Sequence, residues 1–225
     1  MSVILPHQVK DIPRPFVVVC EGYGDVRLVA TLLHHRGISN CNVGCPSTTG
    51  GSGSGKDGIG KYLKALQGAI QSGKANLQGI LVVADADDDA VASFNLMVTA
   101  LQDAAFPAPA TAFAIEGAPL RTGIFLIPGP GRTGCLDHLL WEAAILHNPA
   151  LPRCAADFFT CTGNHIAVAP PNNQAKMRMS AIVAAHCADN PWASGALIWS
   201  DPGNPVPVAS VAFNDLSNFL VTFAS

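Results

Sequence analysis

Short apolar runs alternate along the first part of the chain with longer segments whose apolar residues recur at helical spacing. Runs of about five apolar residues are typical of strands buried on both faces of a parallel sheet. On this pattern we expect strands at 16–20, 38–44, 79–84 and 122–127, and helices at 25–36, 57–72 and 89–105. Strand and helix in repetition predict right-handed crossovers. The expected fold class is therefore α/β, with a mostly parallel central sheet and helices on both faces.

The pattern changes in the second part of the chain. The sequence there predicts helices at Leu136–His147, Lys176–Cys187 and Asn214–Phe223, separated by loops rich in Pro, Asn and Gly. Thr111–Ile115 is a candidate for a further strand. Neither an internal repeat nor a clean linker divides the sequence. We expect an N-terminal extension at 1–14, an α/β core at 15–130, and a helical C-terminal elaboration at 131–225 packed on the same domain.

Composition narrows the classes of protein to which the chain can belong. With 225 residues and 49% hydrophobic content, it can bury a substantial core. A charged fraction of 13% and a net charge of −3 argue against a nucleic-acid coat or a membrane-surface protein, so any nucleic-acid contact must be local or assisted by a partner. No apolar run approaches the ~20 residues of a membrane span, and no signal-peptide pattern is visible. The seven cysteines include no CxxC pair, so we expect reduced thiols, a cytoplasmic location and no membrane association.

Acidic residues follow two of the expected strands directly. Glu21-Gly22-Tyr23-Gly24-Asp25 follows the first strand, and Asp85-Ala86-Asp87-Asp88-Asp89 follows the third. Ligands of open α/β sheets bind outside the carboxyl ends of the strands, so both clusters should meet in one crevice. Carboxylates gathered there repel one another and lose hydration, and hard oxygen ligands suit Mg²⁺, Mn²⁺ or Ca²⁺. The sequence therefore predicts a divalent-metal site.

Each of these charged residues also has a structural explanation. Asp25 and the second acidic cluster stand where they could cap the helices that follow them. Asp137, beyond the strand at 122–127, could reach the same crevice or lie beside the positive end of a helix dipole. Lys176 is either a solvated surface lysine or, with Arg178, a small basic patch for a phosphate. On this explanation the chain is a structural α/β domain with acidic turns.

A glycine-rich segment imitates a nucleotide-binding loop. Gly50-Gly51-Ser52-Gly53-Ser54-Gly55-Lys56 fits the GxxxxGK pattern of a P-loop. Its next residue is Asp57 rather than Ser or Thr, and it follows the second strand instead of the first. We therefore expect a glycine hairpin leading into a helix capped by Asp57, without nucleotide hydrolysis. A backbone nest that contacts a nucleic-acid phosphate stays open as an alternative.

Taken together, the acidic motifs resemble those of the Toprim domain. The motifs are EGxxD at Glu21–Asp25 and DxD at Asp85–Asp87, within a match that spans 15–130. The nearest resemblance is to small stand-alone Toprim/OLD-like (overcoming lysogenization defect) proteins of unassigned function. In these a strand ending in Ile-Pro or Met-Pro precedes a Gly-x-Leu-acid stretch, here Ile127-Pro128 and Gly134–Asp137. Asp137 stands where that group usually has Glu.

This resemblance implies a Mg²⁺- or Mn²⁺-dependent nuclease that cleaves phosphodiesters of DNA or RNA with two ions ~4 Å apart. The implied catalytic residues are Glu21, Asp85, Asp87 and Lys176, and the implied metal ligands are Glu21, Asp25, Asp85, Asp87, Asp89 and Asp137. The alternative is a non-catalytic Toprim module that binds metal or nucleotide with a partner ATPase, a defence-system protein or a second copy of itself. The acidic balance favours this alternative, because neutralising a phosphate calls for Lys or Arg, whereas the intact carboxylate set favours the enzyme.

Overall fold

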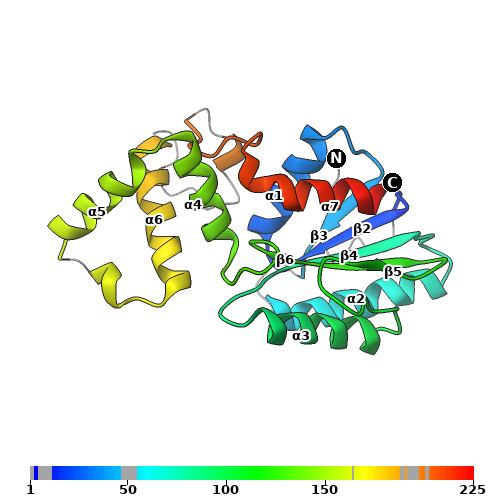
Figure 1. The fold of residues 1–225 in the computed structure, drawn as a ribbon. Helices are drawn as coiled ribbons and strands as arrows, with labels where there is room; N and C mark the ends of the chain where they lie inside the picture. The colour runs from blue at the N-terminus through cyan, green and yellow to red at the C-terminus, as the bar shows by residue number, and fades with distance from the viewer. Residues whose placement is uncertain are drawn as a thin grey trace.

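A computed structural model describes residues 3–4, 12–46, 55–163, 165–187, 191, 198–200 and 203–225. In this part of the chain, a six-stranded sheet runs in the order β1-β3-β2-β4-β6-β5, with helices on both faces (Figure 1). Its parallel strands are β1 (Val3–Ile4), β2 (Phe16–Cys20), β3 (Cys41–Gly44), β4 (Gly79–Asp85) and β6 (Arg121–Ile127), and β5 (Ile115–Glu116) pairs antiparallel with β6. The expected α/β class and mostly parallel sheet are confirmed.

Successive side chains of the central strands point to opposite faces, as the pleat requires. Val18 and its register partner Leu81 pack with helices α1 (Tyr23–His35) and α7 (Asn214–Ala224). Val19 and its partner Val82 pack on the other face with α2 (Lys56–Gln71) and α3 (Ala90–Asp103). Because both faces are covered, the strands read in sequence as continuous apolar runs rather than alternating ones.

The chain leaves the sheet after β6 and builds a helical lobe beyond it (Figure 1). This lobe contains α4 (Leu136–His147), α5 (Leu151–Cys161) and α6 (Pro171–His186), with the 3₁₀ helices η2 (His165–Val168), η3 (Ile198–Ser200) and η4 (Val211–Phe213) along the same stretch and the return path. Leu139 of α4 and Ile182 of α6 belong to the same buried cluster as the α1 face of the sheet. The chain then returns to the sheet as α7, so the lobe is an excursion within the fold.

Several element boundaries differ from those expected. Helix α5 was not predicted, although Leu151, Ala155 and Phe159 recur at four-residue spacing and are buried. Helix α6 begins at Pro171, ahead of the expected position, because proline fits the first turn of a helix. The expected strand at 111–115 is replaced by the short edge strand β5, and β1 lies in the expected N-terminal extension.

The start of α2 also differs from expectation. Its N-cap is Gly55, with a φ of 77°, and Asp57 lies inside the first turn without a capping hydrogen bond, so the prediction of an Asp57 cap was wrong. The glycine segment 50–54 that precedes it lies outside the described residues. Among the helices that the structure describes, none has the length and apolar character needed to cross a membrane.

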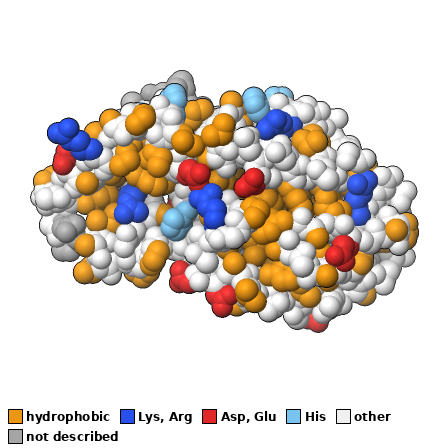
Figure 2. Space-filling view, in the orientation of Figure 1, with side chains coloured by type: hydrophobic (Ala, Val, Ile, Leu, Met, Phe, Trp, Pro, Cys, Tyr) orange, Lys and Arg blue, Asp and Glu red, His pale blue; other side chains and the backbone are white. Residues whose placement is uncertain are grey.

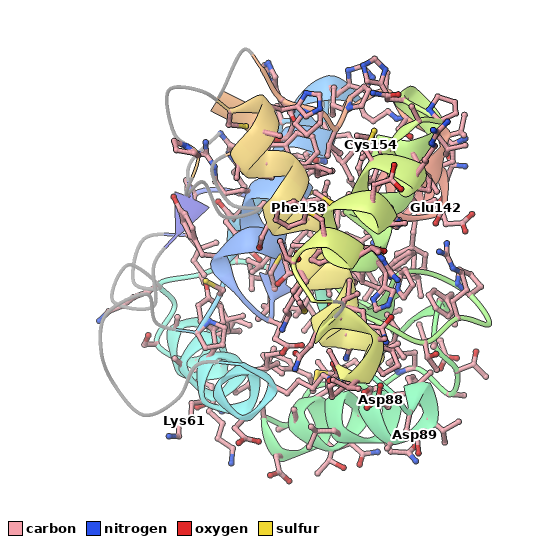
Figure 3. The ribbon with its side chains drawn as sticks, turned by 90° about the vertical axis from the view of Figure 1, so that its left-hand side faces the viewer. Lys61, Asp88, Asp89, Glu142, Cys154 and Phe158 are labelled. Carbon is pink, nitrogen blue, oxygen red and sulfur yellow. The ribbon has the colours of Figure 1, made fainter. Side chains whose placement is uncertain are left out.

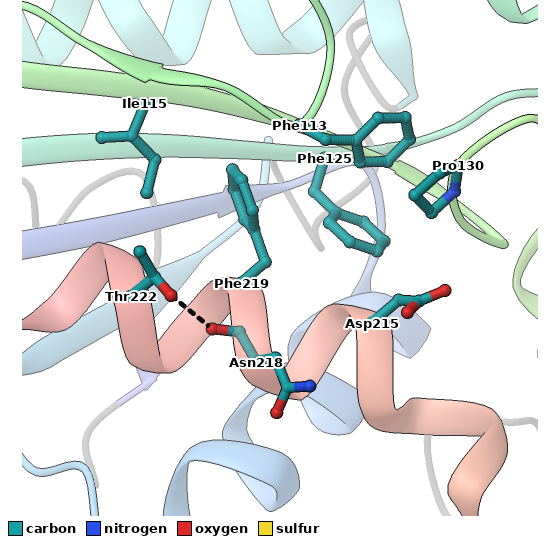
Figure 4. A pocket seen from close by; sticks show the side chains of 8 residues that line it. All are labelled: Phe113, Ile115, Phe125, Pro130, Asp215, Asn218, Phe219 and Thr222. Carbon is teal, nitrogen blue, oxygen red and sulfur yellow. Dashed lines mark hydrogen bonds between the residues drawn. The ribbon is translucent and has the colours of Figure 1, made fainter.

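A groove of about 500 Å³ lies between α7 and the β5–β6 edge of the sheet (Figure 4). Its aromatic wall is formed by Phe125, whose ring centroid lies 5.1 Å from that of Phe113 and 5.6 Å from that of Phe219. The acidic residue on its rim is Asp215. None of the residues that the sequence predicted for the active site lines this groove, so it does not represent the predicted crevice.

We expect α7 to be an integral part of the core, and Phe223 to report it. Phe223 is fully buried and its ring packs edge-on against that of Phe16, with 5.4 Å between centroids. Phe223→Ala should lower the free energy of unfolding by about 3–5 kcal/mol, because it leaves a cavity beside the sheet. Urea denaturation measures the change. Val221→Ala, on the exposed side of the same helix, should change it by less than about 0.5 kcal/mol; equal effects of the two variants would contradict this view of α7.

Candidate functional site

The two acidic motifs meet where neighbouring parallel strands end. Strand β2 pairs directly with β4, and the pairing continues past the end of β2, where the backbone amide of Glu21 donates to the carbonyl of Val83 at 3.1 Å. Glu21 therefore lies beside Asp85, the last residue of β4. This juxtaposition follows from strand order alone, since the carboxyl ends of adjacent parallel strands share one edge of the sheet.

Backbone amides hold one oxygen of each of three carboxylates. Glu21 Oε2 accepts from the amide of Asp85 at 3.1 Å. Asp85 Oδ1 accepts from the amide of Leu136 at 2.9 Å, at the N-terminus of α4, where the helix dipole favours negative charge. Asp25 Oδ2 accepts from the amide of Gly22 at 2.9 Å, which closes a capping box at the start of α1. The main chain thus fixes where these side chains lie.

Helix capping explains the position of only one of the two carboxylate oxygens of Asp25. Its residue is 6% exposed, and its Oδ1 is buried without a hydrogen-bond partner among the described residues. Burial, followed by the negative charge of Glu21, raises the pKa of Asp25 to about 7. A buried carboxylate oxygen without a protein donor carries a desolvation cost that a proton, a cation or a bound donor would offset. The structural explanation of Asp25 is therefore incomplete.

Crowding of like charge extends to the other carboxylates of the cluster. The pKa of Asp85 is raised well above its ordinary value by burial and then by the charges of Asp25 and Glu21. Burial also raises the pKa of Glu21 and of Asp137. Asp137 lies in the first turn of α4, and its charge contributes in turn to the raised pKa of Asp25. The cluster therefore carries more negative charge than this environment accommodates.

Asp87 differs from these residues because its carboxylate is committed to side-chain donors. Its Oδ2 forms an ion pair with Lys56 Nζ, and its Oδ1 accepts from Asn172 Nδ2 at 3.2 Å. Its φ of 51° lies in the left-handed region, which Asp tolerates better than most residues. The backbone is held there by two 2.7 Å hydrogen bonds with Gly134, one in each direction.

Lys56 and Asn172 were not predicted as members of the site. For Lys56 the sequence did carry a signal, namely the GK at the end of the glycine-rich segment. At Gly55 an added Cβ would lie 3.8 Å from Glu21 Oε1, so the start of α2 runs close to the carboxylates. The positive φ of Gly55 favours glycine there. Asn172 lies in the first turn of α6, in a stretch that the sequence analysis expected to be a loop, and no motif marked it as a site residue.

Lys176 faces the cluster from the helical lobe. It is an exposed residue of α6, one turn beyond Asn172, and its positive charge lowers the pKa of both Glu21 and Asp137 against the effect of burial. Through these interactions the structure brings together six of the predicted site residues. They are Glu21, Asp25, Asp85, Asp87, Asp137 and Lys176.

Asp89, the seventh, is placed as a helix cap instead. Its Oδ1 accepts from the amides of Val91 and Ala92, each at 2.9 Å, as the N-cap of α3. Asp89 is exposed, and Figure 3 shows it with Asp88 at the start of that helix. A short acidic side chain at an N-cap satisfies its own following amides, which is the structural explanation that the sequence had left open.

The donor chemistry of the cluster fits a hard divalent cation. Among the described residues, no three His, Cys, Asp or Glu side chains form a ready-made ligand set. Glu21, Asp25 and Asp85 each turn one oxygen to a backbone amide. The unpartnered Asp25 Oδ1 and the excess of carboxylate charge are what Mg²⁺ or Mn²⁺ would compensate. Glu21, Asp25 and Asp85 are thus the residues able to hold such an ion.

Comparison with known protein families gives one match. A family model described as "Protein of unknown function (DUF3226)" matches residues 15–198. The match includes every site residue from Glu21 to Lys176 and ends before α7. No curated protein and no solved structure matches the chain.

Stability without metal should fall as pH rises. Because the folded-state pKa of Asp25 is about 7, above its ordinary value of 3.8, protonation of this group favours the folded state, and that contribution is lost as pH rises toward 7. In a chelating buffer we expect the free energy of unfolding to drop by on the order of 2–3 kcal/mol between pH 5 and pH 8. Urea denaturation at the two pH values measures this drop.

The isosteric Asp25→Asn variant should make this pH profile less steep, because its uncharged amide replaces one titrating group and removes a charge that raises the pKa of Asp85. Asp103→Asn is the control, since Asp103 lies in an exposed ion pair with Lys64 at 3.7 Å and should leave the profile as in the wild type. A profile as steep in Asp25→Asn as in the wild type would show that the pH dependence has another origin.

Proposed function

We propose that this chain, which belongs to the family of proteins of unknown function DUF3226, is a divalent-metal-dependent enzyme that cleaves phosphodiester bonds of nucleic acid. The observation that carries the proposal is the unpartnered oxygen of buried Asp25 within a cluster of carboxylates at adjacent strand ends. The resemblance of the EGxxD and DxD motifs to those of Toprim and OLD-like proteins supports it. DNA and RNA are both candidate substrates.

In this proposal Glu21, Asp25 and Asp85 hold Mg²⁺ or Mn²⁺. A bound divalent ion supplies a Lewis acid and lowers the pKa of water that it carries. The protein's own contribution is positional, because backbone amides fix Glu21 and Asp85 at one edge of the sheet. Glu21 has an alternative role in this proposal, as a general base instead of a metal ligand.

Charge from the helical lobe completes the proposed active site. Lys176 is exposed where its charge acts on Glu21 and Asp137, so a phosphate entering the crevice would meet its ammonium group. There it would stabilise negative charge that develops on the phosphate. Asp137 adds a carboxylate from the start of α4. Asp89 has no part in this proposal, because helix capping accounts for it.

A second candidate function is a non-catalytic module that binds metal or nucleotide beside a partner protein, such as an ATPase, a defence-system protein or another copy of the chain. It is favoured by the surface charge. On the face in Figure 2, basic side chains are few and scattered rather than gathered in a stripe. Binding along a nucleic-acid backbone normally needs Lys or Arg at each neutralised phosphate. A cytoplasmic location remains a proposal for either candidate.

Metal binding should be visible as stabilisation. If the folded chain binds Mn²⁺ and the unfolded chain does not, the free energy of unfolding should rise by about 2.7 kcal/mol at an ion concentration 100 times Kd. Asp85→Asn keeps an acceptor for the Leu136 amide but removes the charge, so it should lose most of this gain. The control Asp103→Asn should keep it in full. Thermal midpoints in Mn²⁺ that equal those in chelator would argue against the site.

Cleavage separates the two candidate functions. Glu21→Gln and Asp85→Asn should each abolish Mn²⁺-stimulated nicking of plasmid or single-stranded DNA, and cleavage of RNA if that is the substrate. Lys176→Ala should lower the rate by roughly 10²–10³-fold while keeping the Mn²⁺-dependent rise in thermal midpoint, because its proposed partner is the phosphate. Lys64→Ala, on the surface of α2, serves as the control. Nicking that survives in Asp85→Asn would place the active site elsewhere, and a wild type without any cleavage would favour the binding module.

A further inference from the structure

Lys56 is a largely buried cation held between Asp87 and the buried residue Ser93. Its Nζ pairs with Asp87 Oδ2 and donates to Ser93 Oγ at 2.7 Å, and its side chain is only 13% exposed. Ser93 is itself 6% exposed, and its hydroxyl donates to the carbonyl of Ala86 at 2.9 Å. A surface lysine would have lost less solvation and would sample many rotamers. Lys56 instead has a fixed position beside the carboxylate cluster.

Each carboxylate oxygen of Asp87 has a protein donor, although its side chain is 47% exposed. Its second oxygen accepts from Asn172, and its main chain is paired with Gly134. Both carboxylate oxygens are therefore satisfied by protein donors. Asp25 provides the contrast within the same site, because one of its oxygens has no partner among the described residues. The cluster therefore has two parts: Asp87 is paired with the Lys56 ammonium group, whereas Asp25 has an oxygen without a protein donor among the described residues.

We propose that the site takes one divalent cation rather than two, and that the Lys56 ammonium group occupies the second cation position. This inference rests on the proposed metal site at Glu21, Asp25 and Asp85. In two-metal sites the ions lie ~3.5–4 Å apart and share carboxylate ligands. A second ion at Asp87 would lie beside the Lys56 ammonium group, which repels it and competes with it for the same carboxylate.

Lys56 is in this view a positioning residue. Its charge also lowers the pKa of Glu21, so it acts on the metal-binding part of the cluster as well as on Asp87. The fixed Lys56 ammonium group then supplies part of the positive charge that a second metal ion supplies in two-metal enzymes. The expectation of two ions, which came from the resemblance to Toprim and OLD-like nucleases, did not take into account this lysine, which starts α2 and contacts Ser93 of α3.

Counting bound ions tests the inference. Isothermal titration of the full chain with Mn²⁺ alone should give one ion per chain for the wild type. Lys56→Met keeps much of the side-chain volume without the charge and frees Asp87, so it should bind a second ion. Lys64→Met changes a lysine of the same helix whose partner Asp103 lies 3.7 Å away on the surface, and it should still bind one. Far-UV circular dichroism verifies that each variant is folded.

Two Asp87 variants make the test independent of how well Lys56→Met folds. Asp87→Asn in the wild-type background should still bind one Mn²⁺ with unchanged affinity, because Asp87 does not hold that ion. In Lys56→Met/Asp87→Asn the second ion should disappear again. Two ions in the wild type, or loss of an ion in Asp87→Asn, would overturn the inference.

The result also separates this inference from the proposed function. One ion per chain in a protein that cleaves no nucleic acid would leave the role of Lys56 standing and defeat only the nuclease. Cleavage with two ions in the wild type would defeat only the role of Lys56. A wild type that binds no Mn²⁺ would overturn both.

Discussion

Repulsion among carboxylates at the joined ends of β2 and β4 is the constraint on which the rest of the site depends. The fold places Asp25 and Asp85 in a largely buried position. Burial raises the pKa of both, the charges of Asp25 and Glu21 raise the pKa of Asp85 further, and the charge of Glu21 raises that of Asp25. Backbone amides and the N-terminus of α4 offset part of this cost. Asp25 Oδ1 remains without a donor, and strained electrostatics of this kind are typical of functional sites.

The helical lobe is part of this electrostatic arrangement. After β6 the chain runs into α4, whose first amide binds Asp85, and α6 then brings Asn172 and Lys176 to the same crevice. Leu139 and Ile182 tie the lobe into the core on the α1 side of the sheet. The return of the chain as α7 covers that same sheet face (Figure 1). Sheet, lobe and closing helix therefore depend on one another.

Two lysines serve the cluster in different ways because they differ in exposure and partners. Lys56 is nearly buried and bound to Asp87 and Ser93, so its charge belongs permanently to the protein. Lys176 is exposed and its charge lowers the pKa of Glu21 and Asp137, so its ammonium group is open to a ligand. With Lys56 neutralising the carboxylates and Lys176 open to a ligand, less positive charge from metal ions is needed for the site to bind a phosphate.

The sequence alone determined the central strands and the meeting of the two acidic motifs, because burial on both faces produces apolar runs and parallel strands end at a common edge. It also identified six carboxylate and lysine side chains that the fold gathers. The sequence offered helix capping as one explanation of Asp89, and the structure shows that cap. Only the tertiary structure decided that Asp87 pairs with Lys56 and Asn172. Local patterns report burial and capping, whereas these pairings join residues 31 and 85 positions apart, whose distance is set by how α2 and α6 pack against the sheet edge.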